Sequence, residues 1–366
     1  MTVLANAMWG SRAYRWWMAA LASAVAAGVL LWWRQWEQGL ALTGMSRDVA
    51  WGLYIGQFTF FVGVAASAVT VVLPYYLHGW KAFGRVVILG ELLAIASVVV
   101  AMLFVFVDLG RPDRLLNVML HPSPSSLMFW DLLALAGYLG LNVILARAAL
   151  AAEIDGAPPA AWARALVLIS IPWAVSIHTV TAFLYAGLAG RPFWLTAAMA
   201  PRFLASAFAA GPALLILLCH AFGYDAGEEA LRKLRLVMTY AMTANVFLAL
   251  MEVFTAFYSG IPEQAAHYGP WTWLSGGLAA AALAMALARS RYAPAAVFAS
   301  LVIDKGVVLI PAGFIPSPTG TVTPYIPTAV ELGIVLAIWC AGALLVTVLF
   351  RVAESYNRDS CPPHPS

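Results

Sequence analysis

Apolar residues form long runs along almost the whole chain, separated by short clusters of charged residues, proline and glycine. A helix that crosses the hydrocarbon core of a bilayer needs about 20 consecutive apolar residues. The pattern therefore predicts ten membrane-spanning helices joined by short loops. Their expected ranges are 14–33, 50–73, 86–107, 126–150, 163–187, 203–222, 235–259, 271–288, 294–315 and 327–350.

The predicted fold class is an all-α polytopic membrane protein, with a single integral membrane domain over residues 1–366. No loop is long enough for a second domain. Any hydrophilic catalytic machinery must then come from partner subunits. We expect no independent active site for a soluble substrate in this chain.

The composition excludes a water-soluble globular protein, because 63% of the residues are hydrophobic, 10% are charged and the mean hydropathy is +0.85. Twenty Lys and Arg against 17 Asp and Glu give a net charge of +3, which is too balanced for a nucleic-acid-binding protein. The first apolar run carries Trp16 at one end and Trp33 at the other, and no small-residue cleavage site follows it. We expect a retained helix rather than a signal peptide.

Basic residues are distributed unequally between the two faces that ten spans define. The face that holds both termini has thirteen Lys and Arg residues, and the opposite face has six. By the positive-inside rule, both termini lie in the cytoplasm, and loops 108–125 and 316–326 face outward. The six basic residues expected on the outward face are Arg34, Arg47, Arg111, Arg114, Arg191 and Arg202.

A short set of polar residues falls inside the predicted helices. A charged group at the centre of a membrane helix costs about 2.5–3.5 kcal/mol on insertion scales, so each is a functional candidate. A rise of about 1.5 Å per residue along each helix sorts these residues by their depth in the membrane. They form an outer tier in the outer half and a middle tier near mid-depth, and one residue, Glu91, lies toward the cytoplasm. The outer tier is Gln57, Asp131, His178, Glu252 and Glu331, and the middle tier is Asn245, Asp304 and Lys305. Such a gradient suits a site that exchanges protons within the bilayer. The structural alternative is that these groups pair across helices and hold the bundle together.

The segment from Asp108 to Asp131 joins the third and fourth helices on the outward face. Its glycine and prolines exclude one continuous helix, whereas Leu115, Leu116 and Met119 are too apolar for a solvated loop. We expect it to fold back on the outer surface. It is then a lid over a lipophilic ligand, a docking surface for an extrinsic subunit or a plain interfacial turn.

The histidines and cysteines predict no haem, no iron–sulfur cluster and no metal site in this chain. A b-type haem needs two facing His at matching depth, whereas His178 is expected in the outer half and His220 at the cytoplasmic end of its helix. The cysteines form no CxxC pair. A lone intramembrane His is either a satisfied hydrogen-bonding group or a donor to a quinone carbonyl, since it can bond and exchange a proton near neutral pH.

Several long motifs are similar to those of one known family, the NrfD-type integral membrane subunits of oxidoreductase complexes. The resemblance covers about residues 45–350 and includes the count of ten helices. Within this family, the motifs most resemble those of the branch that serves dissimilatory sulfur metabolism. The motifs are SRDVAWGLYIGQFTFFVGVAASAV (46–69), LFVFVDLGRPDRLLNVMLHPSPSSLMFWD (103–131), SIPWAVSIHTVTAFLYAGLAGRPFW (170–194), APRFLASAFAAGPALLILL (200–218) and IDKGVVLIPAGFIPSPTGTVTPYIPTAVE (303–331).

The resemblance implies two four-helix bundles side by side, from helices two to five and six to nine, flanked by helices one and ten. It implies a haem-free subunit in the bacterial inner membrane that binds a quinone, either menaquinone or ubiquinone, near the outer face. The implied partners are a periplasmic iron–sulfur subunit, a multihaem cytochrome c subunit, a cytochrome b membrane subunit and a cytoplasmic iron–sulfur subunit.

Residue roles follow from the resemblance and from the chemistry of the quinone reaction. His178 matches the quinone-ligand position, and Asp131 or Glu252 would exchange the proton. We expect Asp108 and Arg111 to fix the loop over the pocket, and Tyr54 and Gln57 to bond the second carbonyl. Related sequences use Asn and His in the second helix, where this chain has Tyr54 and Phe58.

Glu91, Asn245, Asp304 and Lys305 would form a proton path to the cytoplasm, with Asn245 as the first candidate partner of Asp304. A buried ion-pair anchor is the alternative for Asp304 and Lys305. Two other functions stay open for the whole chain. One is an ion-coupled secondary transporter, which should show helix breaks at equivalent places in two halves. The other is a purely structural membrane anchor.

Overall fold

The computed structural model describes residues 11–78, 80–154 and 161–359, and every regular element in this part of the chain is a helix. Ten helices in this part are long and apolar enough to cross a membrane, so the predicted all-α polytopic fold is confirmed. The first five spans are α2 (Arg12–Gln38), α3 (Leu53–Ala66) continued by α4 (Val69–His78), α5 (Gly84–Asp108), α7 (Leu127–Ile154) and α8 (Ala161–Ala186). The last five are α9 (Met199–Phe222), α10 (Glu228–Tyr258), α12 (Pro270–Leu287), α13 (Ala293–Ile303) continued by η4 (Asp304–Val308) and α14 (Leu309–Phe314), and α15 (Ala329–Asp359).

The connections contain only short helical turns. They are η1 (Leu40–Leu42), η2 (Lys81–Phe83), η3 (Pro112–Arg114), α6 (Asn117–Leu120) and α11 (Pro262–Ala265). Several helices extend beyond their predicted ranges; among them, α9 begins at Met199, α10 begins at Glu228 and α15 ends at Asp359.

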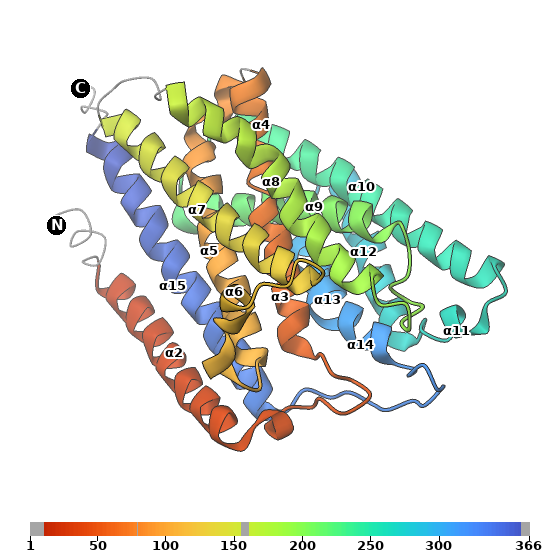
Figure 1. The fold of residues 1–366 in the computed structure, drawn as a ribbon. Coiled ribbons are helices and arrows are strands. Elements are labelled where there is room, and N and C mark those ends of the chain that lie inside the picture. Colours follow the sequence, from red (N-terminus) through yellow and green to blue (C-terminus); the bar gives the residue numbers. More distant parts are fainter. Residues whose placement is uncertain (1–10, 79, 155–160, 360–366) are drawn as a thin grey trace.

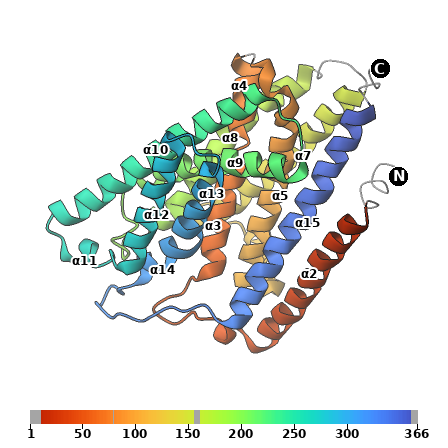
Figure 2. The ribbon, with the colours of Figure 1, turned by 180° about the vertical axis from the view of Figure 1, so that it is seen from behind.

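The spans form two bundles with two flanking helices (Figure 1). Helices α3, α4, α5, α7 and α8 pack together, and α9, α10, α12, α13, η4 and α14 form the second group. The long helices α2 and α15 pack against each other, and α15 also packs on α5 (Figure 2). This is the two-bundle arrangement that the family resemblance implies. Every residue of α3 is buried, because α3 contacts its own bundle as well as α9 and η4 of the other.

Helices α2 and α15 run antiparallel, so the start of α2 and the end of α15 lie on one side, which we call the terminal face. Loops 39–52 and 315–328 lie side by side on the other side, the opposite face. Two hydrogen bonds join them: Thr323 Oγ1 donates to Asp48 Oδ2 at 2.8 Å, and Thr328 Oγ1 donates to the Leu42 carbonyl oxygen at 2.7 Å. Trp16 and Trp33, at the two ends of α2, are 73% and 51% exposed, as an aromatic belt requires.

Two spans are irregular where the bundles meet. The second span, predicted as one helix over 50–73, is divided at Ser67 and Ala68 into α3 and α4. Ser67 Oγ donates to the Val64 carbonyl oxygen at 2.5 Å, and α9 approaches this break so closely that a Cβ on Gly211 would overlap the Ser67 side chain. The ninth span contains the π-helical turn η4, and such turns are frequent at functional sites.

Candidate functional site

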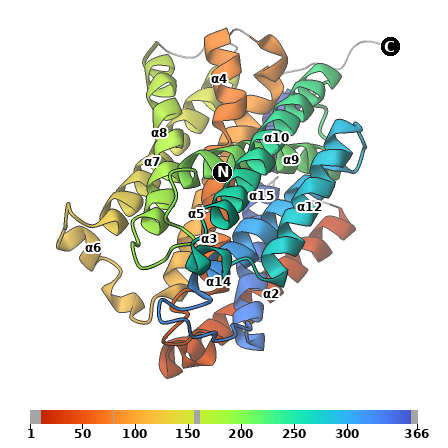
Figure 3. The ribbon, with the colours of Figure 1, turned by 90° about the vertical axis from the view of Figure 1, so that its right-hand side faces the viewer.

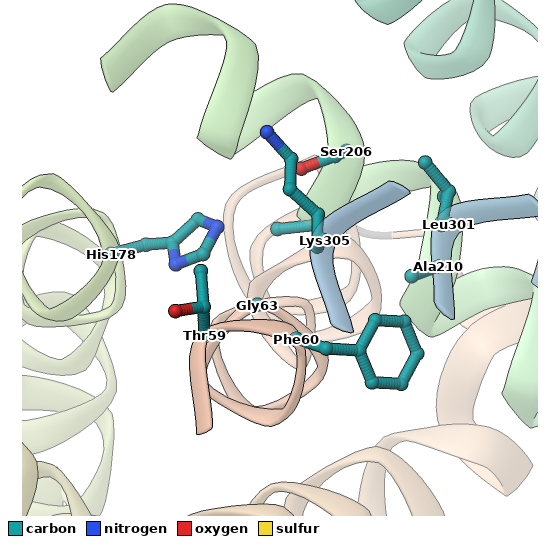
Figure 4. A pocket seen from close by; sticks show the side chains of 9 residues that line it. Thr59, Phe60, Gly63, His178, Ser206, Ala210, Leu301 and Lys305 are labelled. Atoms are coloured by element: carbon teal, nitrogen blue, oxygen red, sulfur yellow. The ribbon is translucent and has the colours of Figure 1, made fainter. Parts of the chain in front are cut away.

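A small cavity lies between the two bundles, where α3, α8, α9, α13 and η4 meet (Figure 4). Its volume is about 10 Å³, close to the space that one water molecule occupies. His178 and Lys305 line it from different helices, with Thr59 and Gly63 of α3 below them and Ser206 of α9 beside the Lys305 side chain (Figure 4). The lining residues are Thr59, Phe60, Gly63, His178, Ser206, Ala207, Ala210, Leu301 and Lys305.

His178 is fully enclosed at this cavity. It is 1% exposed, and neither ring nitrogen has a hydrogen-bond partner within the described chain. Gly63 makes room for the ring, because a Cβ there would lie 3.2 Å from His178 Nε2. Buried polar atoms are nearly always hydrogen-bonded, so two free ring nitrogens beside a cavity point to an exchangeable partner.

Lys305 faces the same cavity and lacks a hydrogen-bond partner among the described residues. The residue is 2% exposed, and its Nζ lies 4.0 Å from Asp304 Oδ2. The same Nζ lies 4.1 Å from the centroid of the Phe203 ring. The His178 ring packs on Phe203 as well, with centroids 5.0 Å apart. Phe203 therefore contacts both groups, and its face stabilises the ammonium by a cation–π interaction.

Beside the cavity, Arg202 joins two carboxylates that the sequence placed in different tiers. Its Nη1 donates to Glu252 Oε2 at 2.6 Å, and its Nη2 donates to Asp304 Oδ1 at 3.0 Å. Ser275 Oγ donates to the same Asp304 oxygen at 3.0 Å. This cluster links α9, α10, α12 and η4. Two cations and two carboxylates, counting Lys305, make it electrically balanced when all four are charged.

Asp131 does not line the cavity and is held by Thr181, whose Oγ1 donates to Asp131 Oδ1 at 2.6 Å. Thr181 lies one turn along α8 from His178. Another turn on, the Tyr185 hydroxyl is 2.5 Å from Thr59 Oγ1, which lines the cavity. The hydroxyl groups of Thr181 and Tyr185 thus lie on successive turns of α8, one bonded to Asp131 and the other to a residue that lines the cavity.

A second polar cluster lies nearer the opposite face, at the start of α3. Glu331 Oε1 accepts from the Leu53 N–H at 3.1 Å and from the Tyr325 hydroxyl, and Glu331 Oε2 accepts from the Gly44 N–H at 3.0 Å. Burial, followed by the charge of Glu331, raises the pKa of Tyr325, which lies in loop 315–328. The carboxylate of Glu331 thus caps the first turn of α3.

Tyr54 and Gln57, the predicted quinone contacts of α3, are both engaged in protein contacts. The Tyr54 hydroxyl donates to Gln35 Oε1 at 2.7 Å. Gln57 Nε2 donates to the Gly306 carbonyl oxygen at 2.9 Å, and Gln57 Oε1 accepts from Trp339 Nε1 at 2.9 Å. Gln57 therefore satisfies a backbone carbonyl in the π-helical turn.

Arg111 is not brought to the cavity. It is exposed, it pairs with Asp113 at 3.0 Å, and its guanidinium holds the pKa of Asp113 below the ordinary value. Asp108 lies at the end of α5, and its buried Oδ1 has no partner within the described chain. In this structure Asp108 and Arg111 do not together hold the loop over the cavity. The segment that follows, with Leu116 63% and Leu120 68% exposed, contributes nothing to the cavity lining.

Two members of the expected proton path stay separate from the cluster. Glu91, on α5, is buried with both carboxylate oxygens unpartnered within the described residues. Asn245, on α10, is buried with an unpartnered Oδ1. The prediction that Asn245 pairs with Asp304 is wrong, because Arg202 and Ser275 hold that carboxylate.

One depth assignment was wrong, that of Arg202. His178 and Lys305, assigned to different tiers, share a cavity. Arg202, assigned to the outward loops, lies inside α9 and is buried, because α9 begins four residues before its predicted start at 203. Sequence reasoning missed Arg202, Phe203 and Ser275. An arginine followed by an apolar run was the available signal for the first of these.

Comparison with known proteins agrees with this architecture. The family model for polysulphide reductase NrfD matches residues 41–316, which is most of the chain. The chain belongs to the NrfD family. No group of three or more His, Cys, Asp or Glu that could hold a metal ion occurs in the part of this NrfD-family chain that the structure describes.

Three relatives of this NrfD-family chain belong to redox enzymes. It is 29% identical to a protein assigned as a membrane subunit of dimethyl sulfoxide reductase in Halobacterium salinarum, over 92% of this chain and 90% of that protein. It is 22% identical to a selenate reductase subunit of Mesobacillus selenatarsenatis, over 65% and 64% of the two chains. It is 23% identical to the Hdr-like menaquinol oxidoreductase integral membrane subunit of Archaeoglobus fulgidus, over 49% and 44%.

Proposed function

We propose that this chain is the quinone-interacting membrane subunit of a multi-subunit oxidoreductase, and that the cavity between His178 and Lys305 exchanges protons during quinone-linked electron transfer. The observation that carries the proposal is the pair itself. Two ionisable side chains, each buried and without a hydrogen-bond partner in the described chain, face one cavity at the interface of the bundles. Buried ionisable groups in a membrane protein are functional candidates by default.

The cavity in this structure does not fit a quinone ring. Its volume of about 10 Å³ accommodates one water, whereas small-molecule sites are typically about 300–1,000 Å³. The donor chemistry is nevertheless suitable, since a neutral imidazole can bond a carbonyl and pass a proton. We therefore assign His178 and Lys305 to proton exchange next to a quinone, and we derive no step through a quinone bound in this cavity.

A quinone pool supplies two-electron, two-proton chemistry. A water in the cavity would bridge His178 and Lys305 and let a proton pass between them. Asp131, reached through Thr181, would exchange protons on the His178 side. Arg202 pairs with both Asp304 and Glu252, which leaves Lys305 as the cation of the cluster that has no hydrogen bond to a carboxylate in the described chain and would carry the exchanged proton.

The finer assignments also belong to this proposal. The motifs favour a subunit resembling DsrP, in the bacterial inner membrane with both termini in the cytoplasm. It would serve sulfur metabolism with DsrO-like, DsrJ-like, DsrM-like and DsrK-like partners. The opposite face would be periplasmic and would receive electrons from, or deliver them to, an iron–sulfur subunit. The basic residues support this orientation, because burial of Arg202 leaves five on the opposite face.

The transporter alternative is disfavoured by where the helix breaks lie. One break lies in the second span, at Ser67 and Ala68, and the π-helical turn η4 lies in the ninth. The second span is the first of one bundle and the ninth is the last of the other, so the positions are not equivalent in two halves. Transporters with internal repeats place their broken helices at corresponding positions.

The test is made on the purified complex in mild detergent. Lipids are extracted and analysed for quinone by mass spectrometry, and electron transfer from a soluble quinol to the natural acceptor is followed in the same preparation. The proposal predicts co-purified quinone and quinol-dependent turnover. Absence of both would leave the structural-anchor function.

A further inference from the structure

The free polar groups of the cavity between the bundles are hydrogen-bond donors. The two hydroxyl groups that line it, those of Thr59 and Ser206, donate to carbonyl oxygens of their own helices at 2.8 and 2.7 Å. Each hydroxyl has a single hydrogen, so neither has one left for the cavity. The side chains of Lys305 and His178 remain, and both lack a hydrogen-bond partner within the described chain. An ammonium group offers three N–H donors and no acceptor.

The carboxylates nearest the cavity are already engaged. Asp304 Oδ1 accepts from Arg202 Nη2 and from Ser275 Oγ, both at 3.0 Å, and Glu252 Oε2 accepts from Arg202 Nη1 at 2.6 Å. Asp304 Oδ2 lies 4.0 Å from Lys305 Nζ, which is beyond hydrogen-bond distance. Neither carboxylate lines the cavity. The lysine therefore faces the cavity without a bonded anion in the described chain.

The cavity lies inside the protein rather than at its lipid-facing surface. Helix α8 lies on one side of α3, and α10 and α12 lie on the other (Figure 3). The remaining lining is apolar and includes Phe60, Ala210 and Leu301. A volume of about 10 Å³ admits one particle about the size of a water molecule. A chloride ion is only slightly larger than water, whereas sulfate and gluconate are far too large.

We infer that this cavity is a binding site for a small monovalent anion such as chloride, held between Lys305 Nζ and the His178 ring. A halide accepts hydrogen bonds from both groups, and bonds between an ion and a charged donor are the strong ones. The cations of Lys305 and Arg202 are balanced by the carboxylates of Asp304 and Glu252. An added anion therefore needs an added cation, and a proton on His178 supplies it.

Two further titratable groups lie near His178. Asp131, on α7, is held by Thr181, and the Tyr185 hydroxyl is bonded to Thr59. Neither Asp131 nor Tyr185 lines the cavity. We therefore assign the proton that accompanies the anion to His178.

The first experiment measures binding from the melting temperature of the assembled complex in detergent. Sodium chloride replaces sodium gluconate at constant ionic strength. Chloride should raise the melting temperature, since a ligand stabilises the state that binds it. Its apparent affinity should be about tenfold higher at pH 6 than at pH 8, because the proton and the anion favour each other's binding. Absence of the rise, or a rise of equal affinity at both pH values, would overturn the inference.

Three variants assign the effect to the cavity. Lys305→Met should abolish the rise. Lys233→Met is the matched control, because Lys233 also lies over an aromatic ring, that of Trp80 at 4.2 Å, but it pairs with Glu229 and does not line the cavity. Ala210→Val fills the cavity from α9 and keeps every charge, so it too should abolish the rise. A rise that persists in Lys305→Met or Ala210→Val, or that is lost in Lys233→Met, would overturn the inference.

Quinol-linked turnover in the same two salts tests what the anion does. This part of the inference rests on the proposed function, because bound chloride would replace the water between His178 and Lys305 and block proton exchange. Turnover of the unaltered complex should fall as chloride replaces gluconate, more steeply at pH 6 than at pH 8. Chloride binding without any effect on turnover would overturn proton exchange at this cavity and leave the anion site standing. Turnover with neither chloride binding nor inhibition would overturn the anion site and leave the proposed function standing.

Discussion

His178 and Lys305 both contact one phenylalanine, Phe203, at 5.0 Å between ring centroids and 4.1 Å from Nζ to centroid. They come from α8 and η4, in different bundles. A change in how the bundles pack would therefore alter both groups together.

Arg202→Met should destabilise the protein, because it leaves Glu252 and Asp304 without their shared cation. Removing one partner of a buried ion pair typically costs about 3–5 kcal/mol. Thermal melting of the detergent-solubilised complex should show a clear loss. The melting temperature of Arg202→Lys should lie between those of the unaltered protein and Arg202→Met. The lysine keeps a positive charge, but an ammonium cannot bond two carboxylates in the fork geometry of a guanidinium. An unchanged melting temperature for Arg202→Met would contradict the cluster.

Gly63→Ala should reduce quinone-linked turnover with little loss of folded protein. Its Cβ would lie 3.2 Å from the His178 ring, so the ring must shift by a few tenths of an ångström in the cavity. Gly140→Ala on α7 is the control, because a Cβ there meets nothing within 4 Å. Equal turnover in the two variants would show that the position of the His178 ring is unimportant.

Gln57→Leu should lower stability by about 1–3 kcal/mol, because it leaves the Gly306 carbonyl oxygen and Trp339 Nε1 buried without a partner. The loss should appear in the melting temperature of the complex. Thr243→Ala is a suitable control, since Thr243 is exposed on α10 and bonds only within its own helix, to the Thr239 carbonyl oxygen at 2.8 Å. Equal melting of the two variants would show that Gln57 does not hold the π-helical turn.

The sequence was sufficient for the ten spans, because each apolar run matches the bilayer thickness. It was insufficient for the break at Ser67, where the apolar run continues, and Pro311, which removes a helical hydrogen bond to η4, does not by itself specify a π-helical turn. Arg202 was misplaced for a related reason. Its partners come from other helices, and hydropathy carries no information on contacts between helices. His178 and Asp304 were identifiable because ionisable residues are rare in such runs, whereas Phe203, which packs on His178, resembles an ordinary apolar residue.

The anchoring of loop 259–269 should weaken in acid. His267 Nδ1 lies 2.7 Å from the Ala312 carbonyl oxygen and 3.0 Å from that of Ile315. Burial lowers the pKa of His267 below its ordinary value of 6.5. The folded state therefore takes up this proton at a lower pH than the unfolded chain, and stability is lost as the pH falls below about 6.5 toward the folded-state pKa.

Melting temperatures at pH 7.5 and 5.5 test this prediction. The fall in melting temperature from pH 7.5 to pH 5.5 should be larger for the unaltered protein than for His267→Gln. The glutamine keeps a hydrogen-bond donor and cannot take up the proton. A fall of the same size in both proteins would remove His267 as the cause.

The central claim is that Lys305 and its cluster move protons in quinone-linked turnover. The double variant Asp304→Asn with Lys305→Met removes one cation and one carboxylate, so Arg202 and Glu252 remain as a balanced pair. The matched control is Glu229→Gln with Lys233→Met, a pair on the surface of α10 with Nζ to Oε1 of 2.9 Å.

The decisive measurement is quinol-linked electron transfer per assembled complex in liposomes, with proton movement followed by a pH-sensitive dye. The account predicts that the double variant assembles and loses at least nine-tenths of both signals, while the surface control keeps them. Normal turnover and normal proton movement in the assembled double variant would contradict it.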